Sequence, residues 1–300
     1  MTHRKYLVSK KDELYGRGVA EIEGTVEAEE IRRTLRHTFA RPDYQPPMLP
    51  SVVLELTQLS YRPEVSFAEV EALLARDPAL CGQLIRAASR GRYLGQPELR
   101  SLRQALMRLG LTRLRNEVLR LSLSGRVFRA VGWNQEVEKV VRHSEFVAQW
   151  AEVVARVAGT DPGFAYLMGL LHDVGILAAL VALGDQRKGR RPDLQLAWPA
   201  ILEEHELAGA RVLRVWGLPD DLVAAVASHH SLPGGGVGRH SAVLALAEAL
   251  ARRAGQQLEA GGCAEKRTDK ATLARAARQL GIRGKLAEVI ELGSEMGLAA

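Results

Sequence analysis

The segment Gly169–Leu180, GLLHDVGILAAL, places a histidine and an aspartate next to each other inside an apolar run. A run of this kind belongs in a protein interior, where an unpaired charge is costly. His172 and Asp173 must therefore be satisfied by a partner, by a hydrogen-bond network or by a metal ion. Any fold of this chain has to bring suitable groups from elsewhere in the sequence to this doublet.

The spacing of apolar residues predicts helices along most of the chain. No run alternates apolar and polar residues for long enough to predict a sheet, and aromatic residues make up only 5% of the sequence. Ser66 with Glu69 is a capping-box pattern, and Asp77 before Pro78 is a second helix start. We therefore predict an all-α protein, with helices over 26–39, 51–60, 66–76, from 77, 99–109, 111–124, 133–158, 162–183, 198–216, 219–230, 240–254 and two within 268–298.

Proline-rich and glycine-rich segments divide the chain. Four prolines in RPDYQPPMLP (41–50) prevent a continuous helix, so we place the start of a domain there. RKGRRPD (187–193) and PGGGVG (233–238) are predicted loops by composition. We expect an N-terminal extension (1–45), a helical N-terminal part (46–132), a helical bundle (133–255) and a C-terminal helical tail (256–300).

Composition also restricts the compartment and the partners. Cys81 and Cys263 form neither a disulfide framework nor a CxxC pair, which favours a reducing cytoplasm. The start of the chain has no secretory signal, and beyond the doublet only about ten apolar residues run unbroken, too few for a membrane span. The net charge of +6 comes from arginines at helical spacing, typical of a solvated face, so we do not expect nucleic-acid binding.

Five histidines and two carboxylates are predicted to face one helical core. His143, for example, lies three residues after Val140 and four before Val147, on an apolar face. A single inward histidine is usually an ordinary core residue, whereas this number of them favours a metal site for Zn²⁺, Mn²⁺ or Fe. The candidate metal ligands are His143, His172, Asp173, His205, His229, His230 and Glu248.

The order of these residues resembles the HD superfamily of metal-dependent phosphohydrolases and, more closely, the HDOD domain of bacterial signalling. The likeness covers about residues 47–255 and includes LPSVVLELTQLS, DPALCGQLIRAAS, SLRQALMRLGLTRLRNEVL, GLLHDVG, HELAGARVLRVWGLP and AVASHH. It implies a helical N-terminal part packed on an HD-like bundle. It also implies one or two divalent ions of Mn, Fe, Zn or Ni and no organic cofactor. One site would use His143, His172, Asp173 and Glu248, and Asp173 would bridge to a second with His205, His229 and His230.

Several positions depart from the pattern of active relatives. Ile176 stands where active HD enzymes often carry a lysine that serves the phosphate or its water, and Glu248 stands where aspartate is usual. Lys139 stands where HD-GYP proteins can offer a further carboxylate, and SLPGGGVG replaces their GYP loop. We therefore do not expect hydrolysis of cyclic di-GMP.

Two functions remain open from the sequence. We favour a cytoplasmic output module of bacterial signal transduction that is non-catalytic and contacts signalling proteins such as a sensor kinase, a receiver or a cyclic-nucleotide enzyme. The alternative is an HD-type metal-dependent phosphohydrolase that acts on a nucleotide or another phosphate ester, which the nearly complete ligand set favours. We assign no residue a catalytic role.

Overall fold

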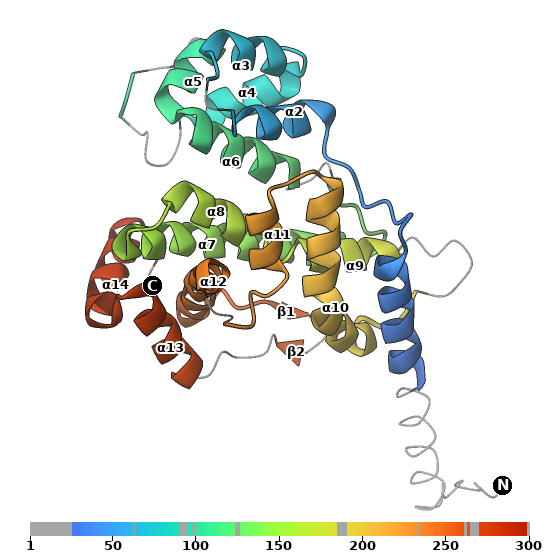
Figure 1. Ribbon diagram of the computed structural model, residues 1–300. Helices are drawn as coiled ribbons and strands as arrows, with labels where there is room; N and C mark the ends of the chain where they lie inside the picture. Colours follow the sequence, from blue (N-terminus) through green and yellow to red (C-terminus); the bar gives the residue numbers. More distant parts are fainter. Residues whose placement is uncertain are drawn as a thin grey trace, which may run out of the picture.

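The computed structural model describes residues 26–62, 64–89, 95–97, 99, 101–123, 127–184, 191–232, 235–260, 263–264 and 270–298. Its helices form an upper lobe and a larger lower bundle (Figure 1). The prediction of an all-α protein is confirmed, and one pair of two-residue strands is added to it. A continuous hydrophobic core runs through both parts and reaches from Ile31 to Leu298.

Within the described residues, the upper lobe contains five short helices: α2 (Ser51–Leu59), α3 (Phe67–Leu74), α4 (Pro78–Ala87), α5 (Leu102–Leu109) and α6 (Leu111–Ser122). Both predicted start signals are formed. Ser66 Oγ accepts the Glu69 N–H, while Glu69 Oε2 accepts the Ser66 N–H at 2.9 Å. Asp77 Oδ1 accepts the Leu80 N–H at 3.0 Å. Local capping therefore fixes where α3 and α4 begin.

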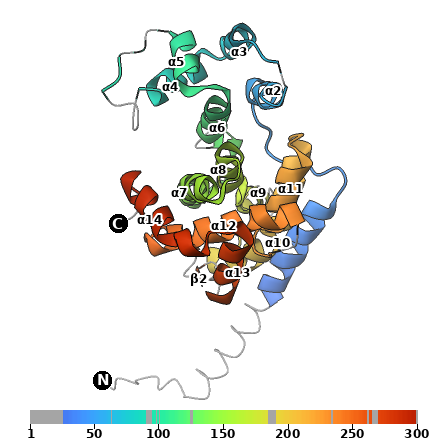
Figure 2. The same cartoon turned by 60° about the vertical axis from the view of Figure 1, so that its left-hand side comes forward.

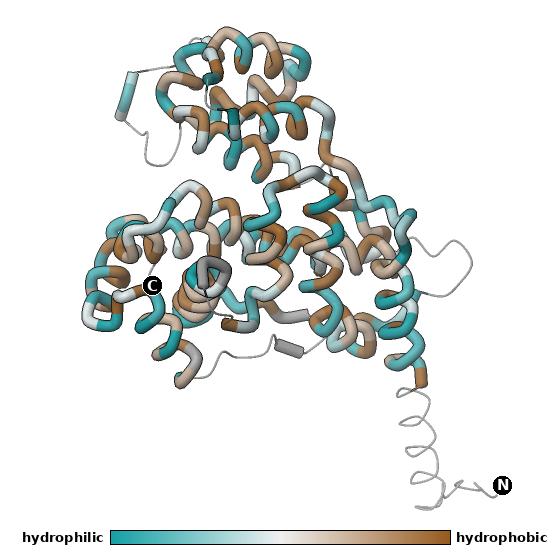
Figure 3. Tube along the Cα trace, in the orientation of Figure 1, coloured by the Kyte–Doolittle hydropathy of each residue, from teal (hydrophilic) through white to brown (hydrophobic). Residues whose placement is uncertain are grey.

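The lower bundle contains the longer helices: α7 (Asn134–Ala158), α8 (Pro162–Leu171), α9 (Val174–Gly184), α10 (Leu194–Val215), α11 (Asp220–Val226) and α12 (Gly235–Arg253). The antiparallel strands β1 (Glu259–Ala260) and β2 (Cys263–Ala264) follow, and then α13 (Lys270–Leu280), η3 (Arg283–Lys285) and α14 (Leu286–Glu295). A helix over residues 26–40 precedes all of these and lies beside α10 in both views (Figures 1 and 2). Hydrophilic positions cover much of its outer side (teal in Figure 3).

Several predicted boundaries in the bundle are wrong. The helix expected to start at 198 begins at Leu194. The single helix expected over 162–183 is broken at His172 and Asp173, which form a turn between α8 and α9. The helix expected to end at 230 ends at Val226. The loop expected over 233–238 is shorter, because α12 begins at Gly235. Gly238 is buried in the first turn of α12, so packing there outweighs the low helix propensity of glycine.

The break at the doublet has a geometric consequence. In a continuous helix, consecutive side chains project about 100° apart. In the turn, His172 Nε2 instead lies 3.1 Å from Asp173 Oδ2, and both side chains are fully buried. The flanking segment, residues 162–184, has the length and hydropathy of a membrane span, but 83% of its most apolar window is buried inside the protein. It forms the centre of the bundle.

Candidate metal centre

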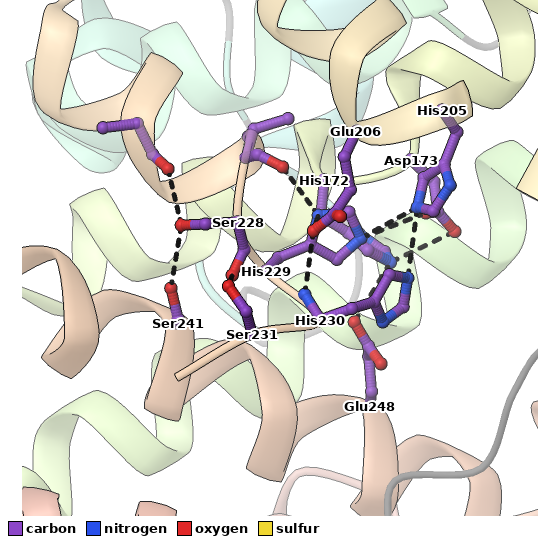
Figure 4. Close-up of polar contacts among 12 residues, drawn as sticks. His172, Asp173, His205, Glu206, Ser228, His229, His230, Ser231, Ser241 and Glu248 are labelled. Atoms are coloured by element: carbon purple, nitrogen blue, oxygen red, sulfur yellow. Dashed lines mark hydrogen bonds and ion pairs between the residues drawn. The ribbon is translucent and has the colours of Figure 1, made fainter. Parts of the chain in front are cut away.

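The structure brings all seven sequence-predicted ligands to one place, from five segments of the bundle. His172 and Asp173 occupy the turn between α8 and α9, while His205 comes from α10, His229 and His230 from the turn after α11, and Glu248 from α12 (Figure 4). His143 comes from α7. Six of the seven are buried. His230, in the turn after α11, is the exposed member of the set. Its ring still contacts His205.

Asp173 lies at the centre of the cluster. Its Oδ2 is 3.1 Å from His172 Nε2 and 3.8 Å from His143 Nε2. Its Oδ1 is 3.7 Å from His205 Nε2 and 3.8 Å from His229 Nε2. The two carboxylate oxygens therefore face two different pairs of histidines.

Glu248 approaches the same centre from α12 (Figure 4). Its Oε1 lies 3.9 Å from His172 Nε2, and it groups with His172 and His229 as a possible set of metal ligands. The extra methylene of glutamate, relative to the aspartate usual in the family, does not keep this carboxylate away from the cluster.

The backbone sets the orientation of four histidine rings. Each Nδ1 lies within 2.8 Å of a main-chain carbonyl: His143 with Gln256, His172 with Gly169, His205 with Leu202, and His229 with Val226. A carbonyl oxygen can only accept, so each Nδ1 carries a proton, and each ring directs its Nε2 at the centre. Histidines that bind metals usually hold their second nitrogen in this way.

The distances between the ring nitrogens show whether a metal ion would fit among them. His205 Nε2 is 3.1 Å from His229 Nε2 and also 3.1 Å from His230 Nε2. Two nitrogen lone pairs repel at this distance unless a proton or a cation lies between them. Ligand atoms around a tetrahedral ion with bonds of about 2.1 Å are about 3.4 Å apart, which is close to the separations seen here. The donor set and its spacing fit a divalent metal.

The pKa directions of His229 and Asp173 are also compatible with metal binding. Burial, followed by repulsion from the neighbouring histidines, holds the pKa of His229 well below its usual range. Burial alone would raise the pKa of Asp173, but the surrounding histidines, with His172 foremost, hold it well below the ordinary value. A neutral imidazole and an ionised carboxylate are the forms that bind metal ions.

Two glycines allow the ligand-bearing helices to approach each other. A Cβ on Gly175 would lie 1.9 Å from the carbonyl oxygen of His205, and one on Gly169 would lie 2.5 Å from Cα of Ala148. Gly175 thus permits α9 and α10 to touch where His205 faces Asp173. Sequence analysis did not identify it as part of the site, although its place two residues after the doublet was a usable signal.

Glu206 is a second group that sequence analysis missed. Its Oε1 accepts the His230 N–H at 3.0 Å and lies 3.6 Å from His229 Nδ1. It therefore fixes the turn that carries both histidines. Its position beside His205 in the sequence was the only signal for it.

The residue three positions after Asp173 is apolar and enclosed. Ile176 is completely buried in the core. Two cavities, of about 1140 and 1160 Å³, lie elsewhere: one between α6, α7 and α8, and one around Trp133 and Arg191. Neither is lined by any of the seven candidate ligands. Among the seven, His230 is the residue exposed to solvent.

Comparison with known proteins identifies the family of this chain. A family model for the HDOD domain matches residues 47–232. A curated protein of Treponema pallidum (strain Nichols), described as uncharacterized, is 25% identical over 202 residues, which is 62% of this chain. The chain spans only 38% of the length of that relative.

Solved structures share the fold. An HDOD domain protein of unknown function from Geobacter sulfurreducens matches with a TM-score of 0.61 and 22% identity, over 89% of this chain and 96% of that one. A protein from Shewanella amazonensis SB2B, proposed to be a metal-dependent phosphohydrolase, matches with a TM-score of 0.61 and 16% identity, over 86% and 90%. A protein from Marinobacter aquaeolei VT8, proposed to act in signal transduction, matches with a TM-score of 0.60 and 20% identity, over 91% and 66%.

Proposed function

This chain belongs to the HDOD domain family, and we propose that it is a cytoplasmic, non-catalytic output module of bacterial signalling, built around a structural metal centre. One observation carries the proposal: four histidine Nε2 atoms, each oriented by a backbone carbonyl, converge on the buried carboxylate of Asp173. A divalent cation at the centre would compensate the ionised carboxylate and bind the ring nitrogens that surround it.

The residues divide into two groups around Asp173. We propose that His143, His172 and Glu248 hold a divalent ion on the Oδ2 side, and that His205, His229 and His230 offer a second position on the Oδ1 side. When bound, such an ion supplies Lewis-acid polarisation of a ligand or substrate oxygen. In this chain we assign it a structural role, because it would tie together five segments of the bundle.

The surroundings of the centre favour the non-catalytic role. Phosphoryl transfer needs positive charge where negative charge develops, and Ile176 replaces that cation with a fully buried aliphatic side chain. A substrate phosphate would also have to reach Asp173, which is completely enclosed. We therefore propose that the output passes through protein contacts with other signalling proteins.

We also propose the division of the chain into four parts, with boundaries at residues 45/46, 132/133 and 255/256.

One observation favours a second candidate function, that of a metal-dependent phosphohydrolase. The two oxygens of Asp173 face separate histidine groups, which is the arrangement that a carboxylate bridging two metal ions would have. The exposed ring of His230 provides an open edge to the second group. A phosphate ester that reached this edge would be the substrate.

An activity screen separates the two candidates. Protein loaded in turn with Mn²⁺, Fe²⁺, Zn²⁺ and Ni²⁺ is assayed with p-nitrophenyl phosphate, bis(p-nitrophenyl) phosphate, nucleotides and cyclic di-GMP. We expect no turnover above that of the matched Asp173→Asn variant, because charge stabilisation is missing at Ile176. Metal-dependent turnover that disappears in Asp173→Asn and in His230→Ala would contradict the non-catalytic proposal.

A further inference from the structure

The helix over residues 26–40 lies outside the part of the chain that matches the family and packs against the bundle beside α10 (Figures 1 and 2). Its inner face is an apolar stripe of Ile31, Leu35 and Phe39, all buried in the common core. The four-residue spacing of these three residues gives the helix a single docked face.

Two arginines on this helix hold consecutive glutamates of α10. Arg32 Nε donates to Glu203 Oε2 at 2.6 Å. Arg36 donates from Nε at 2.9 Å and from Nη2 at 2.6 Å to Glu204 Oε1. The Glu204 side chain is only 5% exposed, whereas that of Arg36 is 59% exposed. The guanidinium therefore covers a buried carboxylate that would otherwise lack compensation for its lost hydration.

These contacts lie directly beside a candidate metal ligand. Glu204 precedes His205, whose backbone is contacted on another side by α9. There, the carbonyl oxygen of His205 and the amide nitrogen of Gly209 approach Gly175 so closely that no Cβ would fit. The segment of α10 that carries His205 is thus held between α9 and the helix over residues 26–40.

We propose that residues 26–40 form a strap that regulates the metal centre, with Arg36 as the positioning residue that fixes His205 through Glu204. The inference deepens the proposed function and rests on it, because it names how that site is controlled. With the strap docked, the charge of Glu204 is compensated and α10 is rigid around His205. With the strap released, the buried carboxylate is exposed to water, this part of α10 loosens, and one ligand of the centre loses its fixed position.

Hydrogen–deuterium exchange of the full-length protein tests the strap. Arg36→Ala is compared with Arg33→Ala, a matched loss of one arginine from the exposed side of the same helix. On metal-free protein, we expect Arg36→Ala to speed exchange of amides between residues 198 and 212 at least about tenfold, and Arg33→Ala to leave it unchanged. Arg36→Ala/Glu204→Gln, which removes the buried charge, is expected to restore most of the protection.

The metal-loaded protein gives the second measurement. Release of Mn²⁺ or Zn²⁺ to a chromogenic chelator should be faster in Arg36→Ala by a similar factor, and unchanged in Arg33→Ala. Arg36→Lys keeps the charge with fewer hydrogen bonds and should lie between the wild type and Arg36→Ala. This variant also serves if Arg36→Ala does not fold.

The outcomes separate the strap from the metal centre. The strap would be overturned if Arg36→Ala and Arg33→Ala exchange amides over 198–212 at the same rate. If Arg36→Ala does not fold, the same comparison is made with Arg36→Lys. This outcome does not depend on whether the wild type binds metal. Metal release that is equally fast in the compared variants would overturn the link to His205. Absence of metal from the wild type would overturn the metal centre instead, and exchange in the metal-free protein would still decide whether the strap holds α10.

Discussion

Gly175→Ala is expected to destabilise the protein by at least about 3 kcal/mol. The added methyl carbon would lie 1.9 Å from the carbonyl oxygen of His205 and 2.6 Å from the amide nitrogen of Gly209. Both neighbours are backbone atoms of α10, so neither can rotate away, and the two helices must separate. Chemical denaturation followed by circular dichroism measures the loss, and soluble yield reports it if the variant unfolds.

Gly184→Ala is the matched control, because Gly184 lies in the same helix. Its added Cβ would meet nothing closer than the amide nitrogen of Val131 at 3.4 Å. We expect its stability to be unchanged or raised by up to about 1 kcal/mol, since alanine restricts the unfolded chain. Equal stability of the two variants would show that α9 and α10 do not depend on contact at Gly175.

Chelation of the metal is expected to lower the Tm of the wild type by about 10 °C. A ligand present at 1,000 times its Kd stabilises the folded state by about 4 kcal/mol. For a protein of this size each kcal/mol corresponds to a shift of about 2–4 °C. The cluster around Asp173 would lose the cation that separates its crowded acceptors. Differential scanning calorimetry with and without EDTA measures the shift.

Asp173→Asn provides the comparison for this measurement. Asparagine has nearly the shape of aspartate but no charge, so the variant is expected to bind metal weakly and to show almost no response to EDTA. A wild-type Tm that does not change with EDTA or with added metal, while the protein remains folded, would contradict a structural role for the ion.

The helical architecture could be predicted because it depends on local signals. The capping box of Ser66 with Glu69 and the start at Asp77 formed as predicted, and α7 has nearly the predicted length. The broken helix at His172 could not be predicted from periodicity. The apolar pattern continues across the break and carries no signal for it.

The membership of the candidate site could be predicted, but its geometry could not. Helical spacing places His143 and His205 on buried faces, where the structure has them. The same reasoning does not distinguish His229 from His230. Both follow α11 in one turn, where His229 is buried and His230 is exposed. Gly175 and Glu206 act through contacts with other segments, which a pattern along one helix does not contain.

The contacts of the strap with α10 could not be predicted from the sequence either. Sequence analysis predicted a helix over 26–39, but gave no partner for its arginines. Arg36 and Glu204 are 168 residues apart in the chain, and scattered arginines at helical spacing were interpreted as a solvated face. Only the packing of Ile31 and Leu35 into the core identifies the inner side of this helix.

The most direct measurement is the metal content of protein purified without chelators or metal-affinity columns, determined by elemental mass spectrometry. Wild type is compared with His172→Ala/Asp173→Ala. We predict at least one equivalent of Mn, Fe, Zn or Ni in the wild type, lost in the double variant. A folded, stable wild type without bound metal, which also fails to take up these ions when they are added, would contradict the metal centre. The doublet would then be held by hydrogen bonds alone.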